Sequence, residues 1–353
     1  MRRVLVAAIT GGALLLAGCS SAASSGATSG STGSASAQGT TSAAAAAPVT
    51  VRLGFLENVT HASALVGIKE GFFTKALGSA GTVDTTPFST GTEEATALLA
   101  GQLDAAYVGP NPAISAFQKS NGTAIKIISG AATGGASIVV KAGITSASQL
   151  KGESLATPSL GNTQDVAVRY WLQQHGLKTT TTGGGDVFIK PTTPNSAAVL
   201  EFKSGQIAGG SEPAPYDVEM VNDGGTVLLS EPGVTTVLVV TQTFLAAHPA
   251  VVADLLKAQI EANDFIKSNI AAAEADVNAE LGSLTGKPLK ASLLAASFKE
   301  ITFTDDPDEA SFTADAQQAT SLGLLKSASL TGIFDLTPLN AQLAAAGETQ
   351  VGS

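Results

Sequence analysis

Small polar residues and glycines gather at four points where a strand-like segment gives way to a helical pattern. Strands of a parallel α/β sheet end at a common edge, so such junctions can converge on one crevice. Backbone N–H groups at helix starts, with the helix dipole behind them, bind anions or polar groups without needing a lysine. We therefore expect a binding crevice, although each junction taken singly is also explained as a helix cap. The four junctions are Asn58-Val59-Thr60-His61, Ser89-Thr90-Gly91-Thr92, Gly109-Pro110-Asn111 and Ser159-Leu160-Gly161-Asn162-Thr163.

Patterns typical of catalysis are missing from the sequence. There is no Gly-x-Ser-x-Gly turn, no P-loop and no Gly-x-Gly-x-x-Gly after a strand. The histidines His61, His175 and His248 are far apart and share no metal-ligand spacing. His175 and His248 stand beside Gly176 and Pro249, which favours roles at a helix end and a helix start. We expect no catalytic residues, no metal and no cofactor.

An acidic run near the C-terminal end has two interpretations. Grouped carboxylates could hold calcium, because hard cations prefer oxygen ligands. A proline among acidic residues is also typical of a helix start, and neither EF-hand spacing nor its glycine follows. We favour the helix start for the run Asp305-Asp306-Pro307-Asp308-Glu309.

The N-terminal residues indicate export and lipid attachment. Arg2 and Arg3 precede an apolar run at 4–17, which is too short to span a bilayer comfortably. The run ends in Leu-Ala-Gly-Cys, which matches the lipobox of bacterial lipoproteins, and we expect Cys19 to carry the lipid. An ordinary signal peptide with an incidental cysteine is the alternative. Residues 20–48 are nearly all Ser, Ala, Gly and Thr and are expected to form a flexible tether. The protein is thus expected to be extracytoplasmic and anchored to the cell membrane.

Length and charge narrow the class further. The residues after the tether suffice for two lobes, each with its own core. The chain has 19 basic and 29 acidic residues, and removal of Arg2 and Arg3 leaves 17 against 29, a net charge of −12. Nucleic acid is therefore not an expected partner. Since Cys19 is the single cysteine, no disulfide can form within the chain.

Strand and helix patterns alternate beyond the tether, which predicts βα units and mainly parallel sheets. A strand over 49–55 precedes a helix over 61–70 that Gly71 ends. Thr92 with two following glutamates is expected to cap the next helix, before a strand over 103–108. Asn111 is expected to cap a third helix, with Pro112 in its first position.

Two apolar strands bracket a central block with its own βα pattern. They cover 136–141 and 235–241 and are expected to cross between the lobes. Within the block a helix begins at about Asn162 and closes at Gly176. From about 248 to 346 the pattern is mostly helical, and we expect this tail to pack back on the first lobe.

These segments together resemble the substrate-binding proteins of ABC importers for aliphatic sulfonates, nitrate and taurine. The same group includes binders of thiamine-precursor pyrimidines. The resemblance covers nearly all of the chain after the tether. It is carried by Gly54-Phe55-Leu56-Glu57-Asn58-Val59-Thr60-His61-Ala62 with Gly71-Phe72-Phe73, Leu103-Asp104-Ala105-Ala106-Tyr107-Val108-Gly109-Pro110, Thr157-Pro158-Ser159-Leu160-Gly161-Asn162-Thr163-Gln164-Asp165, and Phe303-Thr304-Asp305-Asp306-Pro307.

The resemblance implies an α/β, two-lobed periplasmic-binding-protein fold of type II with two hinge crossover strands. Lobe 1 would comprise 49–137 and 238–350, and lobe 2 would comprise 138–237. The protein would be a monomer that captures a small anion between its lobes by hinge closure and delivers it to a permease with its ATPase. The implied ligand-binding residues are Asn58, Thr60, His61, Gly91, Thr92, Gly109, Asn111, Ser159, Gly161, Asn162, Thr163 and, near the mouth, Glu212.

One departure from the family leaves the ligand open. Many relatives read Trp-x-Pro-Glu-Pro-Trp at the second-lobe wall, where this chain reads Gly209-Gly210-Ser211-Glu212-Pro213-Ala214-Pro215-Tyr216. Tyr216 either replaces the lost aromatic bulk or packs from a helix. The alternatives to a sulfonate, taurine or nitrate are a thiamine-precursor pyrimidine or, less favoured, an anchored enzyme using Lys190 or His61.

Overall fold

The computed structural model describes residues 47–352. The signal sequence, Cys19 and nearly all of the tether lie outside the described residues, so their predicted roles stay predictions. No helix within 47–352 is both long enough and apolar enough to cross a membrane.

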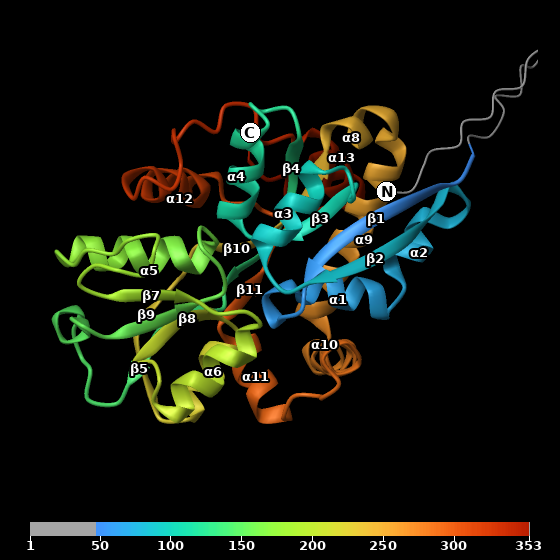
Figure 1. Ribbon diagram of the computed structural model, residues 1–353. Helices are drawn as coiled ribbons and strands as arrows, with labels where there is room; N and C mark the ends of the chain where they lie inside the picture. The colour runs from blue at the N-terminus through green and yellow to red at the C-terminus, as the bar shows by residue number, and fades with distance from the viewer. Residues whose placement is uncertain (1–46, 353) are drawn as a thin grey trace, which may run out of the picture. The chain divides into compact units, whose positions relative to one another are not determined.

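Two separate sheets organise the described chain (Figure 1). The six-stranded sheet has the order β11-β4-β10-β3-β1-β2. Its strands are β1 (Val49–Leu56), β2 (Gly81–Phe88), β3 (Ala105–Val108), β4 (Ile125–Gly134), β10 (Val234–Thr241) and β11 (Ile301–Phe303). The five-stranded sheet has the order β7-β6-β8-β5-β9. Its strands are β5 (Ala136–Lys141), β6 (Ser154–Thr157), β7 (Phe188–Pro191), β8 (Gly209–Pro213) and β9 (Gly225–Ser230).

Both sheets are mixed, so the prediction of mainly parallel sheets is wrong. The strands β1 and β6 pair in parallel with both of their neighbours. The strands β10 and β5 pair antiparallel with both of theirs. The antiparallel pairs arise because the chain leaves the six-stranded sheet through β4, enters the other sheet directly as β5, and returns directly from β9 to β10. No helix intervenes at these passages to turn the chain back into a parallel strand.

The chain passes between the sheets in two short linkers placed just before β5 and β10. The strands expected to cross, 136–141 and 235–241, each belong to one sheet. Gly134 and Gly135 form the first linker with φ of 71° and 72°, a left-handed conformation that favours glycine. The N–H of Gly134 donates to the carbonyl of Gly233 in the second linker at 2.9 Å. The two linkers therefore lie side by side.

Helices cover both sheets, and their apolar faces form the core. Figure 1 shows α1 and α2 beside the six-stranded sheet and α5 and α6 beside the five-stranded one. The helices before the second linker are α1 (Ala62–Lys69), α2 (Phe72–Leu77), α3 (Gly91–Leu99), α4 (Pro110–Lys119), α5 (Thr163–Gln174), α6 (Asn195–Ser204) and α7 (Tyr216–Asn222), with 3-10 turns η1 (Val59–His61), η2 (Gly78–Ala80) and η3 (Ala147–Leu150).

The tail is helical as predicted, except for β11. The long helix α9 packs on α1 and α2, but α11 also contacts α7 and α12 contacts α5. The tail therefore reaches the five-stranded sheet as well, which the sequence prediction missed. Its helices are α8 (Gln242–Ala247), α9 (Pro249–Ser268), α10 (Ile270–Thr285), α11 (Ala291–Lys299), α12 (Glu309–Ser321) and α13 (Thr337–Ala346).

Three sequence expectations about helix ends are confirmed. His175 is the C-cap of α5, and its ring Nδ1 lies 2.8 Å from the carbonyl of Trp171. Pro249 begins α9 directly after His248. Asp308 caps α12 by accepting from the N–H of Ser311 at 3.1 Å. The acidic run is thus a helix start, and no group of three potential metal ligands occurs among residues 47–352.

Candidate functional site

A small cavity lies where the two sheets face each other. Its volume is about 20 Å³, which is room for roughly one water molecule. No lysine, arginine or carboxylate is among its lining residues in the described chain. The lining comprises Leu56, Asn58, Thr60, His61, Ser89, Thr90, Gly91, Gly109, Pro112, Pro158, Asn162, Thr163, Gln164, Asn195, Pro213 and Thr235.

The first corner of the cavity is the turn between β1 and α1. The Asn58 carboxamide oxygen accepts from the Thr60 N–H at 3.1 Å and from the Thr60 hydroxyl at 2.7 Å. The N–H of Leu56 donates to His61 Nδ1 at 3.1 Å. Burial lowers the pKa of His61 to about 3, so the ring is neutral near pH 7 and carries its proton on Nε2. His61 therefore serves as an uncharged hydrogen-bond donor.

The starts of α3 and α4 form the second corner. Thr90, and not Thr92, caps α3 by accepting from the Glu93 N–H at 3.3 Å. Gly109, and not Asn111, is the N-cap of α4, since the helix begins at Pro110, two residues before the predicted first position at Pro112. Both corrections have one cause: the chain becomes helical sooner than the position of the polar side chain implied.

The start of α5 closes the cavity from the five-stranded sheet. The Asn162 carboxamide oxygen caps this helix by accepting from the Asp165 N–H at 2.9 Å. Thr163 and Asn195 also line the cavity, and each is at least nine-tenths buried. The Thr163 hydroxyl and the Asn195 carboxamide oxygen are buried without any hydrogen-bond partner in the described chain. A bound ligand or an ordered water would satisfy such atoms.

The two walls touch each other in this structure. The hydroxyl of Thr92 donates to the hydroxyl of Ser159 at 3.0 Å, from α3 to the loop after β6. A Cβ atom built on Gly109 would lie 2.6 Å from Thr163 Oγ1. Glycine at 109 therefore permits the close approach of the walls.

Five of the predicted residues do not line the cavity. Thr92 and Ser159 instead join the walls, and the N–H of Gly161 donates to Asp165 Oδ2 at 2.9 Å. Asn111 is buried, and its Nδ2 lies 3.5 Å from the carbonyl of Asp315. The fifth is Glu212.

Glu212 does not stand near the mouth. Its side chain is fully buried on β8, and neither carboxyl oxygen has a hydrogen-bond partner in the described chain. Burial, with the charges of Asp217 and Glu231 nearby, raises the pKa of Glu212 well above its ordinary value. Its neighbour Pro213 lines the cavity in its place. Strand alternation accounts for this, because successive residues of β8 point to opposite faces.

Tyr216 joins the two sides of the molecule. It begins α7, and its hydroxyl donates to the carbonyl of Glu57 at 3.3 Å. Tyr216 is not among the residues that line the cavity. It therefore packs and bridges, and does not restore an aromatic wall.

Seven predicted residues meet at the cavity: Asn58, Thr60, His61, Gly91, Gly109, Asn162 and Thr163. Sequence reasoning missed Asn195, although its signal was present. The segment Thr192-Thr193-Pro194-Asn195 links β7 to α6 and is a fifth strand-to-helix junction. Thr235 and Pro213 were missed because they lie within strands, where residue type alone does not indicate a cavity.

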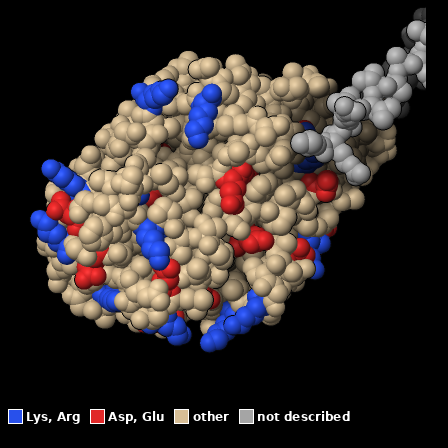
Figure 2. Space-filling view, in the orientation of Figure 1, with Lys and Arg blue, Asp and Glu red and all other residues tan. Residues whose placement is uncertain are grey.

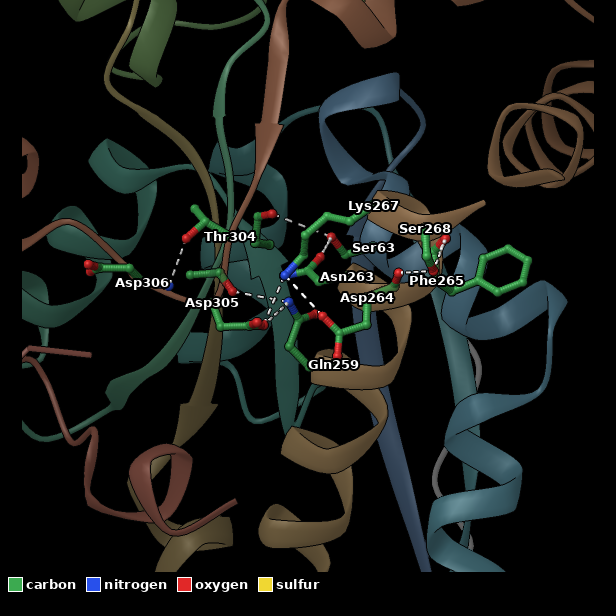
Figure 3. Close-up of polar contacts among 12 residues, drawn as sticks. Ser63, Gln259, Asn263, Asp264, Phe265, Lys267, Ser268, Thr304, Asp305 and Asp306 are labelled. Carbon is green, nitrogen blue, oxygen red and sulfur yellow. Dashed lines mark hydrogen bonds and ion pairs between the residues drawn. The ribbon is translucent and has the colours of Figure 1, made fainter. Parts of the chain in front are cut away.

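A second polar cluster lies buried between α9 and the loop after β11 (Figure 3). Asp305 Oδ1 accepts from Asn263 Nδ2 at 2.8 Å and from Gln259 Nε2 at 3.2 Å. Asn263 in turn accepts from the Ser63 hydroxyl at 2.6 Å, and Gln259 from the Tyr107 hydroxyl at 2.6 Å. Burial raises the pKa of Asp305 to about 6. We call these five side chains the α9 network.

Comparison with known structures supports the architecture. The alkanesulfonate-binding protein SsuA of Xanthomonas axonopodis pv. citri, bound to MOPS, matches with TM-score 0.68 and 16% identity, covering 82% of this chain and 99% of its own. The periplasmic nitrate-binding protein NrtA of Synechocystis PCC 6803 matches with TM-score 0.71 and 16% identity, covering 84% and 89%. A Candida albicans gene product with the generic periplasmic binding protein fold matches with TM-score 0.61 and 12% identity, covering 86% and 96%. The fold is therefore that of the periplasmic binding proteins.

Sequence comparison gives the family. No curated protein sequence matches this chain significantly. The model of the NMT1-like family matches residues 44–281. This range spans η1, the starts of α3, α4 and α5, and Asn195, and so includes every residue that lines the cavity. The chain belongs to the NMT1-like family.

Proposed function

We propose that this protein is the extracytoplasmic solute-binding component of an ABC importer and captures a small anion such as an aliphatic sulfonate, taurine or nitrate. The observation that carries the proposal is the cavity itself. Three helix starts and the neutral ring of His61 converge there, and the hydroxyl of Thr163, which can donate, has no partner in the described chain. Such a site binds an anion through N–H dipoles and not through a countercharge.

Surface charge agrees with this mode of recognition. Figure 2 shows the lysines and arginines of one face spread around its periphery, several of them beside carboxylates, and not gathered into one basic patch. The cavity likewise contains no basic side chain. Affinity for an anion should therefore depend little on salt, because only exposed charges are strongly screened.

Binding would proceed by hinge closure. The cavity of about 20 Å³ is too small to admit a ligand, so the walls must separate first. We propose that the lobes turn about the linkers at Gly134-Gly135 and 231–233. One lobe would then comprise 49–133 with 234–350 and the other 136–230, a few residues from the boundaries of 137 and 238 that were expected from the sequence. Contacts from both lobes to the ligand would exist only in the closed form, so binding would shift the equilibrium toward it. The permease and its ATPase would then recognise the closed monomer.

Attachment at Cys19 completes the proposal. A tether of about thirty residues would hold the domain some 30 Å from its lipid on average. Metabolic labelling with a radioactive fatty acid should mark the intact chain and leave Cys19→Ser unmarked.

A pyrimidine is the second candidate, because one atom favours it. The buried Asn195 Oδ1 needs a donor, which nitrate and simple alkanesulfonates lack. Taurine, through its ammonium group, and an aminopyrimidine both supply one. The two candidates differ in charge and can be separated by a screen.

The test is a thermal-shift screen of the mature chain against taurine, alkanesulfonates, nitrate, bicarbonate and thiamine-pathway pyrimidines. A ligand at a hundred times its dissociation constant stabilises by about 2.7 kcal/mol. Asn195→Ala should then lower the affinity for the best ligand by about tenfold or more. Asn111→Ala is the matched control, since its Oδ1 is also buried and unpartnered but lies outside the cavity. Equal effects of the two variants would refute the site.

A further inference from the structure

A second and much larger cavity adjoins the first. Its volume is about 390 Å³, a size typical of sites for small organic molecules. It is open to solvent on one side and lies between α5, α12 and the linker from β9 to β10. Figure 1 shows α12 lying along α5, and the two helices are in contact. Thr163 and Thr235 line both cavities, so the second shares a wall with the first.

Most of this cavity is apolar. One face of α5 contributes Ala167, Tyr170 and Trp171, spaced so that they lie on the same side of the helix. Leu229 of β9 and Pro232 of the linker also line the cavity. The two aromatic rings are partly exposed, which leaves their surfaces accessible to a ligand.

Two carboxyl groups supply the charge of the cavity. Asp315 comes from α12, and its Oδ2 is buried without a hydrogen-bond partner in the described chain. Glu231 comes from the linker, and its Oε1 accepts from the Ser211 hydroxyl at 2.7 Å. Among the described residues that line the cavity there is no lysine or arginine. The carboxyls therefore lack a cationic partner.

The raised pKa values of Glu231 and Asp315 indicate that no positive charge stabilises their ionised forms. Burial raises the pKa of Glu231 to about 7. Burial and the negative charges of Glu231 and Asp308 raise the pKa of Asp315 to about 8. Further acids lie near Glu231, because its charge also raises the pKa values of Glu212 and Asp217. A positive charge placed between the two carboxyls would offset the repulsion between Glu231 and Asp315.

We propose that this cavity binds a small organic cation, with its ammonium or guanidinium group between Glu231 and Asp315 and its apolar body against Tyr170 and Trp171. The aromatic rings suit such a ligand, because a cation is attracted to the face of an aromatic ring. A bare metal ion suits the cavity poorly. Calcium needs six or more oxygen ligands, and an apolar wall supplies none.

The test uses benzylammonium as the probe and benzyl alcohol as its neutral counterpart. Trp171 is the single tryptophan of the chain and lines the cavity, so its fluorescence reports occupancy directly. We expect benzylammonium to change the fluorescence at concentrations up to about 10 mM and benzyl alcohol to bind at least about tenfold more weakly. Affinity should rise from pH 6 to pH 8, since the carboxyls must lose their protons to the solvent when the cation binds.

Variants separate recognition from folding. Asp315→Asn and Glu231→Gln keep the shape of each side chain and should each weaken benzylammonium by about tenfold. The exposed Glu153→Gln is the matched control and should leave binding unchanged. Far-UV circular dichroism checks that each variant is folded. Equal binding of the alcohol, an unchanged affinity in both cavity variants, or no fluorescence response at all would overturn the proposal. None of these outcomes tests the anion site, whose ligand is identified separately by the thermal-shift screen.

Discussion

The small cavity and the α9 network are both buried and polar, yet they differ in whether their hydrogen bonds are satisfied. In the α9 network Asp305, Asn263 and Gln259 each bond to another side chain. In the cavity Thr163 and Asn195 keep buried atoms with no partner in the described chain. A satisfied network stabilises one arrangement, whereas unsatisfied atoms lower stability until a ligand meets them. A missing partner does not by itself mark a site, because Asn111 Oδ1 and the Thr236 hydroxyl also lack one within the described chain and lie outside the cavity. Thr163 and Asn195 combine a missing partner with a place in the cavity wall.

The largest expected effect is on stability, from Asp305→Ala in the α9 network. Removal of the carboxylate leaves the amide groups of Asn263 and Gln259 without their acceptor, so the free energy of unfolding should fall by about 2–4 kcal/mol. Urea denaturation measures the loss. Ligand affinity, measured by calorimetry on the folded variant, should change less than about twofold. If Asp305→Ala lost much affinity but kept its stability, the α9 network would serve ligand binding and not the fold.

Gly109→Ala should lower ligand affinity and leave the free energy of unfolding nearly unchanged, the reverse of Asp305→Ala. Its Cβ would lie 2.6 Å from Thr163 Oγ1 and would hold the walls apart. We expect affinity to fall by about thirtyfold, or about 2 kcal/mol, with little change in urea denaturation. The double variant Gly109→Ala with Thr163→Ala removes the clashing atom. Closure should then recover, and the double variant should bind more tightly than Gly109→Ala alone.

The pH dependence of stability should differ in sign between the two regions. The folded pKa of Asp305 is about 6, above its ordinary value of 3.8, so stability falls as the pH rises from about 4 to about 6. The folded pKa of His61 is about 3, below its ordinary 6.5, so its contribution to stability is lost as the pH falls through that window.

Isosteric variants isolate these two effects. Asp305→Asn should gain stability relative to the parent by up to about 3 kcal/mol between pH 4 and pH 7. His61→Gln should gain relative to the parent as the pH falls from 6.5 toward 4. Urea midpoints measured across this range give both slopes, and parallel curves for parent and variants would show that neither group is perturbed.

The smallest expected effect compares two buried hydroxyls that both lack a partner. Thr163 lines the cavity, whereas Thr236 lies on β10 outside it. Valine at either position removes a hydroxyl that makes no hydrogen bond within the described chain, so neither change should lower stability by more than about 0.5 kcal/mol. Only Thr163→Val should weaken the ligand, by about five- to tenfold, or roughly 1 kcal/mol. Isothermal titration calorimetry of both variants shows whether ligand affinity depends on a hydroxyl in the cavity wall or on any buried, unpartnered hydroxyl.

Much of the fold could be predicted from local signals. The helix pattern of 61–70, the glycine after it and the Asn162 cap all act within a few residues, and the structure has them close to where they were expected. The caps at Thr90 and Gly109 were each missed by two residues, because several neighbouring residues could act as a cap. The antiparallel pairing of β5 with β8 and of β10 with β4 was missed, because the paired strands are far apart in sequence.

The sequence by itself determined, to within a few residues, where four helices follow strands, and therefore that unpaired N–H groups and polar side chains stand at those strand ends. Only the tertiary structure decided which of them share a cavity. Asn111 and Asn195 illustrate the difference, since both are buried near helix starts with a free Oδ1, but only Asn195 lines the cavity. The physical reason is that capping is a contact between neighbours in the chain, whereas the cavity requires residues 58 to 235 to meet through the order of two sheets.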